Sequence, residues 1–315
     1  RVNQSSLGSA ALGTSSFPVN RPRLAALLGF DGNVTNSLDA NQIAPLDTGV
    51  EVVNVATVSA LTIGMLAADM TAQYAQVKPW LTLSGGDVTG TSSIMPQKRN
   101  PTGLVELRQQ ASTIVGQATT YTVQSHNVPA GMEDYKMDTP SQVLRASARM
   151  YGAVVGLMKA LVFDETRALD EVNAEYSTTT ELADTLQRVA DVPFRVGHHF
   201  ASELVNYGRG HNLRPAEIPY REARRIYAES ARLFRQSPAE LPLGETEFRR
   251  SLTPENMVQS AQGLGGPQSR EVARMLADER ARLAADNQWL AARRESLQRS
   301  EAMRETAFGS LKTNR

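Results

Sequence analysis

The sequence has no cysteine, few aromatic residues and no excess of charge of either sign. Without cysteine in its 315 residues, disulfides and thiolate metal sites are excluded, and a reducing compartment suits the chain. Lys and Arg number 33, as do Asp and Glu, so the chain lacks the basic footprint of a nucleic-acid or membrane-surface protein. No apolar run approaches the roughly 20 residues that a membrane-spanning helix needs. These absences predict a cytoplasmic globular protein without nucleic-acid or membrane partners.

Charge is also scarce in the first third of the chain. Only 10 of residues 1–95 are charged, and the remaining 220 residues carry the other 56. Helices with so few charges are typically buried on several sides, in a multi-helix core or at a subunit interface. The chain starts at Arg1 rather than at a methionine, and its first residues lack the pattern of a signal peptide. We expect the chain to be a piece of a longer protein.

Helical periodicity dominates the sequence, and strand signals are nearly absent. Asn20 is a suitable cap for a short helix over 21–28 that Gly29 ends. Beyond Asp164, prolines separate several shorter helices. The sequence therefore predicts an all-α fold. Three-to-four spacing of apolar residues predicts long helices over 47–81, 102–124, 141–161 and 268–305.

The change from long, charge-poor helices to short, charged ones places a domain boundary near 164–175. The predicted domains are a helix-bundle domain over 1–165 and a smaller helical domain over 166–315. The stretch 268–315 carries ten basic and seven acidic residues, which is typical of a solvated helix laced with ion pairs. A binding tail is the alternative interpretation of the same stretch.

The segment 85–101, GGDVTGTSSIMPQKRNP, is the densest cluster of glycine, polar and charged residues. Gly85 and Gly90 have the separation of a phosphate-binding loop. However, Thr91 stands where that motif needs lysine, and no strand precedes the segment. A phosphate-binding loop is therefore disfavoured.

The end of this segment is better suited to binding a carboxylate. Pro101 fits the first position of a helix with Asn100 as its cap, and a helix N-terminus favours anions. Lys98 and Arg99 add positive charge just upstream. Ser92 and Ser93 lie on the loop before it, and such a site can stabilise an enolate-like dianion while one hydroxyl takes a proton. An ordinary capped helix after a loop explains the same residues equally well.

The run TSSIMPQKRNP at 91–101 resembles the signature of the aspartase/fumarase superfamily, and its QKRN portion is similar to the argininosuccinate lyase branch. Within that branch, the region 127–139 and the charged C-terminal helix are most similar to ethylenediamine-disuccinate (EDDS) lyases. Further matching segments are LGSAAL at 7–12, GF at 29–30, NSLDA at 36–40, PFR at 193–195, LTPEN at 252–256 and GG at 265–266.

The resemblance implies a homotetramer whose long helices form a 20-helix bundle, with a smaller helical C-terminal domain on each subunit. Each active site would draw residues from three subunits. The implied reaction is reversible cleavage of an N-substituted L-aspartate to fumarate and an amine, with no metal or organic cofactor. The family's threonine–histidine motif is not found, because the match begins partway through the family's usual sequence.

The resemblance also implies roles for the signature residues. Ser92 would be the general base that removes a proton from the carbon next to a carboxylate. Lys98 and Asn100 would hold that carboxylate as it becomes dianionic, and Ser93 would help through its hydroxyl or its backbone N–H. A serine hydroxyl is a poor base unless its oxyanion is stabilised, so positive charge and N–H donors are needed nearby.

Two residues depart from the family pattern on the amine side of the substrate. Thr102 stands where relatives have aspartate, and Met132 stands where they tend to have tyrosine. We expect a less polar pocket that suits bulkier or more apolar amines, in a natural or an engineered variant. Met132 as a gap-filling side chain is the alternative. Lys136 is a candidate for the substrate's second carboxylate, or else a solvated lysine.

Two other functions stay open at this point. Argininosuccinate lyase is a close enzymatic alternative, disfavoured by the residues at Thr102 and Met132. A non-catalytic, crystallin-like structural protein on the same scaffold is the alternative from another class, and the intact Ser92, Lys98 and Asn100 argue against it. A metal site is disfavoured because ligand spacing is missing. Structural or surface roles are expected for the four histidines, His126, His198, His199 and His211.

Overall fold

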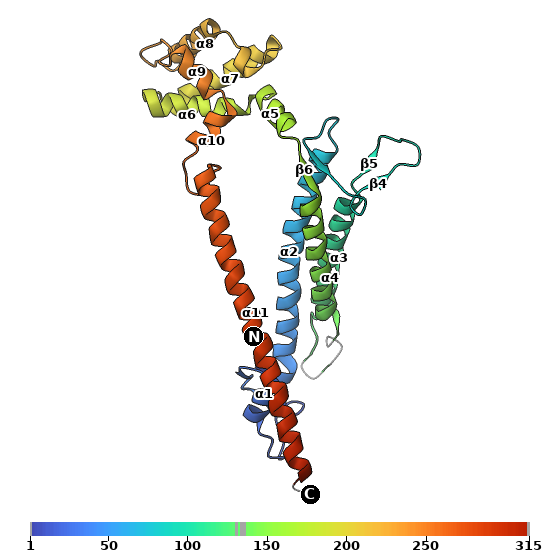
Figure 1. Cartoon of the computed structure of the whole chain (residues 1–315). Helices are drawn as coiled ribbons and strands as arrows, with labels where there is room; N and C mark the ends of the chain where they lie inside the picture. The colour runs from blue at the N-terminus through green and yellow to red at the C-terminus, as the bar shows by residue number, and fades with distance from the viewer. Residues whose placement is uncertain (1, 130–131, 133–136, 314–315) are drawn as a thin grey trace. The chain divides into compact units, whose positions relative to one another are not determined.

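The computed structural model describes residues 2–129, 132 and 137–313, and over these residues the chain is predominantly helical (Figure 1). It contains eleven α-helices, together with six strands of two or three residues each among the described residues. The strands pair into three two-stranded ribbons, β1 with β2, β3 with β6 and β4 with β5. The predicted all-α fold is confirmed.

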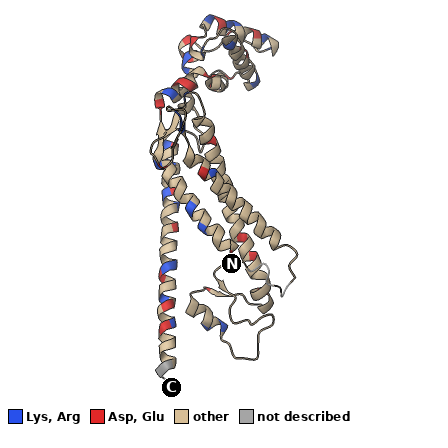
Figure 2. Ribbon diagram, turned by 90° about the vertical axis from the view of Figure 1, so that its right-hand side faces the viewer, with Lys and Arg blue, Asp and Glu red and all other residues tan. Residues whose placement is uncertain are grey.

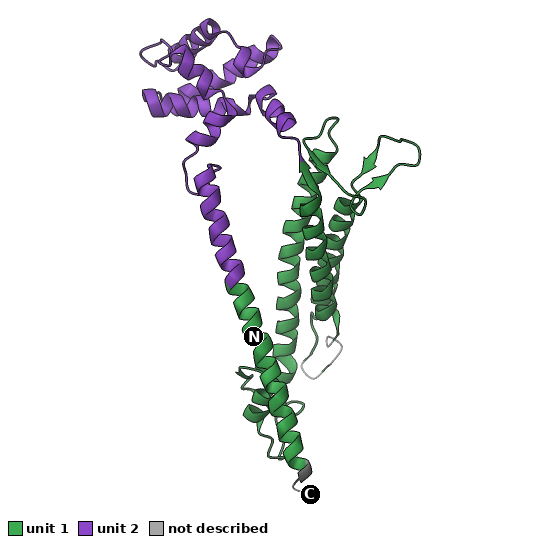
Figure 3. Cartoon of the chain, in the orientation of Figure 1, with its two compact units in different colours: residues 1–162, 285–315 green, residues 163–284 purple. Residues whose placement is uncertain are grey.

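The chain divides into two compact units, shown in different colours in Figure 3. The first unit contains residues 1–162 and 285–315, and the second contains residues 163–284. The predicted domains placed all of 166–315 together. In the structure, residues 285–315 are grouped with the first unit instead, because the end of the last helix packs on the N-terminal segment.

Three long helices form the core of the first unit, α2 (Ala44–Tyr74), α3 (Thr102–Gln124) and α4 (Thr139–Ala160). They lie side by side in Figure 1 and bury one apolar cluster. Several buried residues on the neighbouring helices α2 and α3 are small, which favours a close approach of their backbones. These small buried residues are Gly49, Ala56, Ala60 and Ala67 on α2 and Gly103, Ala111 and Ala118 on α3.

Proline residues lie at the start of α2 and just beyond its end. Pro45 has no N–H to donate to the carbonyl of Asn41, and one wider turn, η1 (Asp39–Ile43), precedes the helix there. The N–H of Ala44 donates instead to the carbonyl of Asp39, five residues back. The predicted C-terminal end at residue 81 was wrong, because α2 ends at Tyr74, before Pro79, and β3 (Leu81–Leu83) follows.

The described helix over Asp39–Tyr74 is long and apolar enough to cross a membrane, by length and composition alone. The expectation from the sequence concerned uninterrupted apolar runs, and those in this helix are short because Thr, Ser, Asn and Gly interrupt them. The helix is apolar enough by its average hydropathy instead. A core helix of a helix bundle has the same composition, and one face of α2 packs on α3 and α4.

The N-terminal segment follows its sequence signals closely. In α1 (Arg21–Leu28), the side chain of Asn20 accepts the N–H of Arg23 at 3.0 Å, and Gly29 ends the helix with φ +81°. The last helix, α11 (Ser269–Thr313), contacts this region within the first unit. Both carboxylate oxygens of Asp31 accept hydrogen bonds from Arg293, at 2.8 and 3.0 Å.

The second unit is a cluster of shorter helices. Its core consists of large side chains, with Phe200, Tyr227 and Phe248 fully buried. Prolines stand at the starts of several of its helices, as the sequence indicated. The helices are α5 (Glu165–Ala174), α6 (Thr179–Ala190), α7 (Phe194–Gly210), α8 (Tyr220–Leu233), α9 (Glu245–Ser251) and α10 (Pro254–Ser260).

Charged residues follow the division that the sequence shows. Figure 2 shows them along α11 and throughout the second unit, and few on α2. On α11 they form ion pairs one turn apart, such as Arg274 with Asp278 at 2.6 Å and Arg282 with Glu279 at 2.7 Å. This is the ion-pair-laced helix that the composition predicted.

Candidate functional site

The signature residues lie on a hairpin that precedes α3. Its two short strands, β4 (Gly90–Thr91) and β5 (Arg99–Asn100), are antiparallel, with Gly90 opposite Asn100 and Thr91 opposite Arg99. The tip of the hairpin, residues 93–98, is exposed, with Ile94 at 87%, whereas Ser92 is half-buried. Figure 1 shows the hairpin extending beyond the start of α3. The fold therefore brings Ser92, Ser93, Lys98 and Asn100 together on one loop.

The base of the hairpin is fixed to the first turn of α3. The N–H of Gly103 donates to the carbonyl of Val88 at 3.0 Å. A Cβ added at Gly103 would lie 3.0 Å from Val88 Cβ and 3.1 Å from Leu157 Cδ2, so only glycine fits this contact without displacement. Sequence reasoning missed this anchor and the strand pair. Glycines at 90 and 103, on either side of the signature, were the available signal.

The hydroxyl oxygen of Ser92 is held by backbone amides of its own loop. It accepts the N–H of Met95 at 3.1 Å and, over a longer contact of 3.4 Å, the N–H of Ile94. Serine side chains commonly accept from the backbone two or three residues ahead in this way. Amide N–H groups directed at the oxygen would stabilise a deprotonated Ser92, which is what a serine base requires.

Arg99 folds back over the same loop. Its guanidinium donates to the carbonyls of Pro96 at 2.9 Å and Lys98 at 3.2 Å, and the N–H of Lys98 donates to the carbonyl of Met95 at 3.0 Å. These contacts close the turn that carries Lys98, whose side chain is exposed. The loop therefore presents a serine hydroxyl and an ammonium group on one short turn.

The prediction that Asn100 caps α3 was wrong. Asn100 lies in β5, its side chain reaches the carbonyl of Thr91 at 3.4 Å, and Pro101 takes the cap position. The N–H groups of Leu104 and Val105 both donate to the carbonyl of Pro101 at 3.1 Å. The amides of Gly103, Leu104 and Val105 therefore have partners within the chain, so a carboxylate bound here would depend more on side chains than on these amides.

The predicted amine-side residues are not all near Ser92. Thr102 is the first residue of α3 and lies at the base of the hairpin. Met132 is 56% exposed and lies between the end of α3 and the start of α4. The 23 residues of α3 span about 34 Å, so within one chain this helix separates Met132 from Ser92. Lys136 lies outside the described residues.

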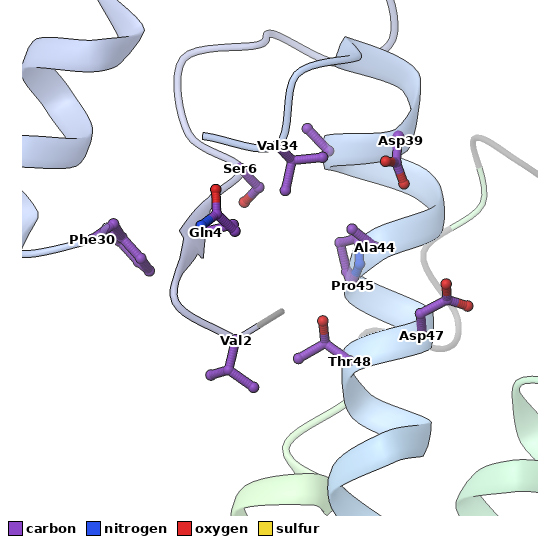
Figure 4. Close-up of a pocket in the computed structure, with 11 residues that line it drawn as sticks. Val2, Gln4, Ser6, Phe30, Val34, Asp39, Ala44, Pro45, Asp47 and Thr48 are labelled. Carbon is purple, nitrogen blue, oxygen red and sulfur yellow. The ribbon is translucent and has the colours of Figure 1, made fainter. Parts of the chain in front are cut away.

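A cavity of about 530 Å³ lies in the first unit beside the start of α2 (Figure 4). In the figure, Thr48 on α2 lies opposite Val2 and Gln4, which belong to the first residues of the chain. Because Gly49 contacts Tyr121, this cavity lies at the end of the bundle where α3 terminates. None of the predicted site residues line it. The lining residues are Val2, Gln4, Ser6, Phe30, Val34, Asp39, Ala40, Ala44, Pro45, Asp47 and Thr48.

The histidines make local contacts in the parts of the chain that are described. His199 Nδ1 lies 3.1 Å from the hydroxyl of Ser230, and His211 Nδ1 lies 2.8 Å from the carbonyl of Tyr207. Among the described residues, no group of three or more His, Asp or Glu side chains is placed to hold a metal ion.

Two family models match the sequence. A model described as "Lyase" matches residues 1–116, and one described as "Argininosuccinate lyase C-terminal" matches residues 176–259.

Solved structures with a similar fold include EDDS lyase in complex with formate. That structure has 26% sequence identity and a TM-score of 0.84, over 97% of this chain and 60% of the EDDS lyase chain. A double variant of EDDS lyase with bound fumarate gives 25% identity and a TM-score of 0.85, over 98% of this chain and 61% of that chain. The chain thus spans about 60% of the length of these relatives.

A class II fumarase from Schistosoma mansoni is more distant. Its identity is 15% and its TM-score 0.59, over 81% of this chain and 53% of that chain. At this identity the similarity concerns the fold alone.

Proposed function

The chain belongs to the aspartase/fumarase superfamily, and on that premise we propose that it is part of a carbon–nitrogen lyase. The proposed reaction is the reversible cleavage of an N-substituted L-aspartate to fumarate and an amine. The observation that carries the proposal is the environment of Ser92, whose Oγ accepts the Met95 amide on a loop that also carries Lys98 and Asn100. The proposed site of action is the cytoplasm.

In the proposed mechanism, Ser92 acts as a base in its deprotonated form. Its Oγ removes a proton from the substrate carbon next to a carboxylate, and the electron pair moves into that carboxylate to give a dianion. Lys98 and Asn100 stabilise the dianion by charge and by hydrogen bonding, with help from Ser93. The electrons then return to form the C=C bond of fumarate as the C–N bond breaks, and the nitrogen, which is protonated in the substrate, takes the bonding pair and leaves as the neutral amine.

The amine side of the substrate is proposed to meet a less polar pocket than in the relatives. Thr102 and Met132 offer a hydroxyl and a thioether, neither of which carries a charge to pair with a second ammonium group. We therefore favour N-substituted aspartates with bulkier or apolar amines over those with a cationic diamine. Lys136 is proposed to bind the second carboxylate of the aspartate portion.

A shared active site in a homotetramer is part of the proposal. Support comes from the position of Met132, about one α3 length from Ser92 in the same chain. A second support is the apolar side of α2 that α3 and α4 leave uncovered, with Val55, Val58, Leu61 and Met65 all more than half exposed. Contiguous exposed apolar patches are characteristic of subunit interfaces.

Argininosuccinate lyase is the second candidate. The match of residues 176–259 to the argininosuccinate lyase C-terminal family favours it, and it shares the proposed chemistry with a different amine. Which amine leaves is therefore the quantity to measure.

The test uses full-length protein and the ultraviolet absorbance of fumarate. The substrates are EDDS, argininosuccinate, and N-cycloalkyl and N-aryl aspartates. We expect fumarate release from at least one of them, reduced about 10²–10⁴-fold in Ser92→Ala. Ser112→Ala is the matched control, since that hydroxyl is on the exposed surface of α3 and donates to the Arg108 carbonyl. No release from any substrate by wild-type protein would instead favour a structural, crystallin-like role.

A further inference from the structure

Gly90 lies in β4 at the base of the signature hairpin, directly against the side chain of Thr102. A Cβ added at Gly90 would lie 2.9 Å from Thr102 Cγ2 and 3.9 Å from Asn100 Cβ. The first distance is shorter than two carbon atoms tolerate, while the second is an ordinary contact. The missing side chain at position 90 therefore makes the room that the methyl group of Thr102 occupies.

This contact fixes which way Thr102 is turned. Threonine is branched at Cβ and is restricted to a few χ1 rotamers in a helix. With Cγ2 seated against Gly90, the hydroxyl Oγ1 must occupy one of the other two positions on Cβ. A methyl group at position 90 would displace Cγ2, and the simplest relief is a rotation of χ1 that moves the hydroxyl as well.

We propose that Gly90 is a specificity-determining residue that acts by positioning the hydroxyl of Thr102 in the amine pocket. The inference rests on the proposed lyase function and adds the residue that sets the orientation of the pocket. Gly90 touches Thr102 rather than the substrate, so it is a positioning residue. In the χ1 rotamer that places Cγ2 against Gly90, Thr102 presents one uncharged hydroxyl to the amine, which suits a leaving group without a second positive charge.

The backbone makes the test practicable. Gly90 lies in an extended strand rather than in the left-handed region that favours glycine, so an alanine costs little backbone strain there. Gly86 is the matched control, because it lies in the same loop and a Cβ added there would meet nothing within 4 Å.

The experiment measures kcat/KM for an apolar N-cycloalkyl aspartate and for EDDS in full-length protein. The variants are Gly90→Ala, Thr102→Ser, the double variant and the control Gly86→Ala. We expect Gly90→Ala to change the ratio of the two kcat/KM values by on the order of tenfold. Because serine lacks Cγ2, the double variant should return to the ratio of Thr102→Ser. Gly86→Ala should keep the wild-type ratio.

Melting temperatures of the same four variants provide a readout that is independent of activity. Gly90→Ala should melt roughly 2–4 °C lower than wild type. The same substitution should lower the melting temperature much less when it is made in Thr102→Ser, because serine lacks the Cγ2 that the new methyl group displaces. The inference is overturned if Gly90→Ala keeps the wild-type ratio of the two kcat/KM values. It is also overturned if the double variant has a ratio different from that of Thr102→Ser. A wild-type protein that releases no fumarate refutes the proposed function instead, and the melting temperatures then still report whether the Gly90–Thr102 contact exists.

Discussion

Gly49 on α2 lies directly beneath the phenol ring of Tyr121 on α3. A Cβ added at Gly49 would lie 2.8 Å from Tyr121 Cζ and 3.0 Å from Cε1, and Tyr121 is buried. The ring therefore occupies the space that a side chain at position 49 would need. This contact sets the distance between the two helices at the end of the bundle opposite the signature hairpin.

Gly49→Ala is expected to destabilise the protein by about 1–3 kcal/mol, because the added methyl group overpacks the contact with Tyr121. Gly64→Ala, on the same helix, is the control. Its Cβ would lie 3.7 Å from Ala111 Cβ, an ordinary contact, so the helix preference of alanine should make the protein more stable by about 0.5–1 kcal/mol. Denaturant unfolding of both variants measures the difference. Equal changes in the free energy of unfolding for Gly49→Ala and Gly64→Ala would show that the Tyr121 ring can move away from the added methyl group.

Local signals determined which parts of the fold could be predicted from the sequence. The cap at Asn20, the glycine at 29 and the range of α3 all depend on neighbours in the chain, and the structure agrees with them. The hairpin base could not be predicted this way, since β4 and β5 have only two residues each and carry no strand periodicity. Their pairing depends on the distant contact between Val88 and Gly103.

The site was predictable as a set of residues but not as an arrangement. The signature motif identified Ser92, Lys98 and Asn100, which do share one loop. The role of Asn100 as a helix cap failed because α3 begins at Thr102, which puts Pro101 at the cap position, and the Asn100 side chain reaches the Thr91 carbonyl across the strand pair instead. The separation of Met132 from that loop follows from the length of α3, and placing both in one pocket would require more than one subunit.

The exposed apolar side of α2 should determine assembly. Leu61 is 59% exposed, and we expect Leu61→Arg to dissociate the proposed tetramer by placing charges in an apolar interface. Leu233→Arg is the control, since Leu233 is 66% exposed on α8. Light scattering after size-exclusion chromatography measures the mass of each variant. A Leu61→Arg protein with the wild-type mass would exclude this side of α2 from the interface.

Glu181 in the second unit is a buried carboxylate that depends on a cation. It is 5% exposed, and its Oε1 accepts hydrogen bonds from Arg188 at 2.6 Å, Thr185 at 2.9 Å and Asn256 at 3.3 Å. Arg188→Met should destabilise the protein by about 2 kcal/mol, because it leaves a buried charge without its cation. Adding Glu181→Gln to Arg188→Met should recover part of that loss, since it removes the unpaired charge.

The control for this pair is Arg225→Met on α8. Arg225 donates to Glu222 at 2.9 Å and to Glu229 at 2.7 Å, and its side chain is half exposed, so the loss of each ion pair costs about 0.2–1 kcal/mol. Urea unfolding gives the free energy for each variant. If Arg188→Met and Arg225→Met destabilise equally, the burial of Glu181 has no energetic consequence.

The start of α11 should make stability depend on pH in the acid range. Hydrogen bonds from Arg274 and then from the Gly265 N–H lower the pKa of Glu271 to about 2, well below its ordinary 4.5. A carboxylate whose pKa is lower in the folded state stabilises the fold above its ordinary pKa, and that stability is lost as the pH falls from about 4.5 toward 2.

Wild type should therefore unfold at a higher urea concentration than Glu271→Gln at pH 6, and the difference should shrink by pH 3. Glu279→Gln, which changes an exposed carboxylate paired with Arg282, should show a smaller difference at pH 6. A gap between wild type and Glu271→Gln that stays constant from pH 6 to pH 3 would mean that the charge of Glu271 does not hold the turn at Gly265 against the helix.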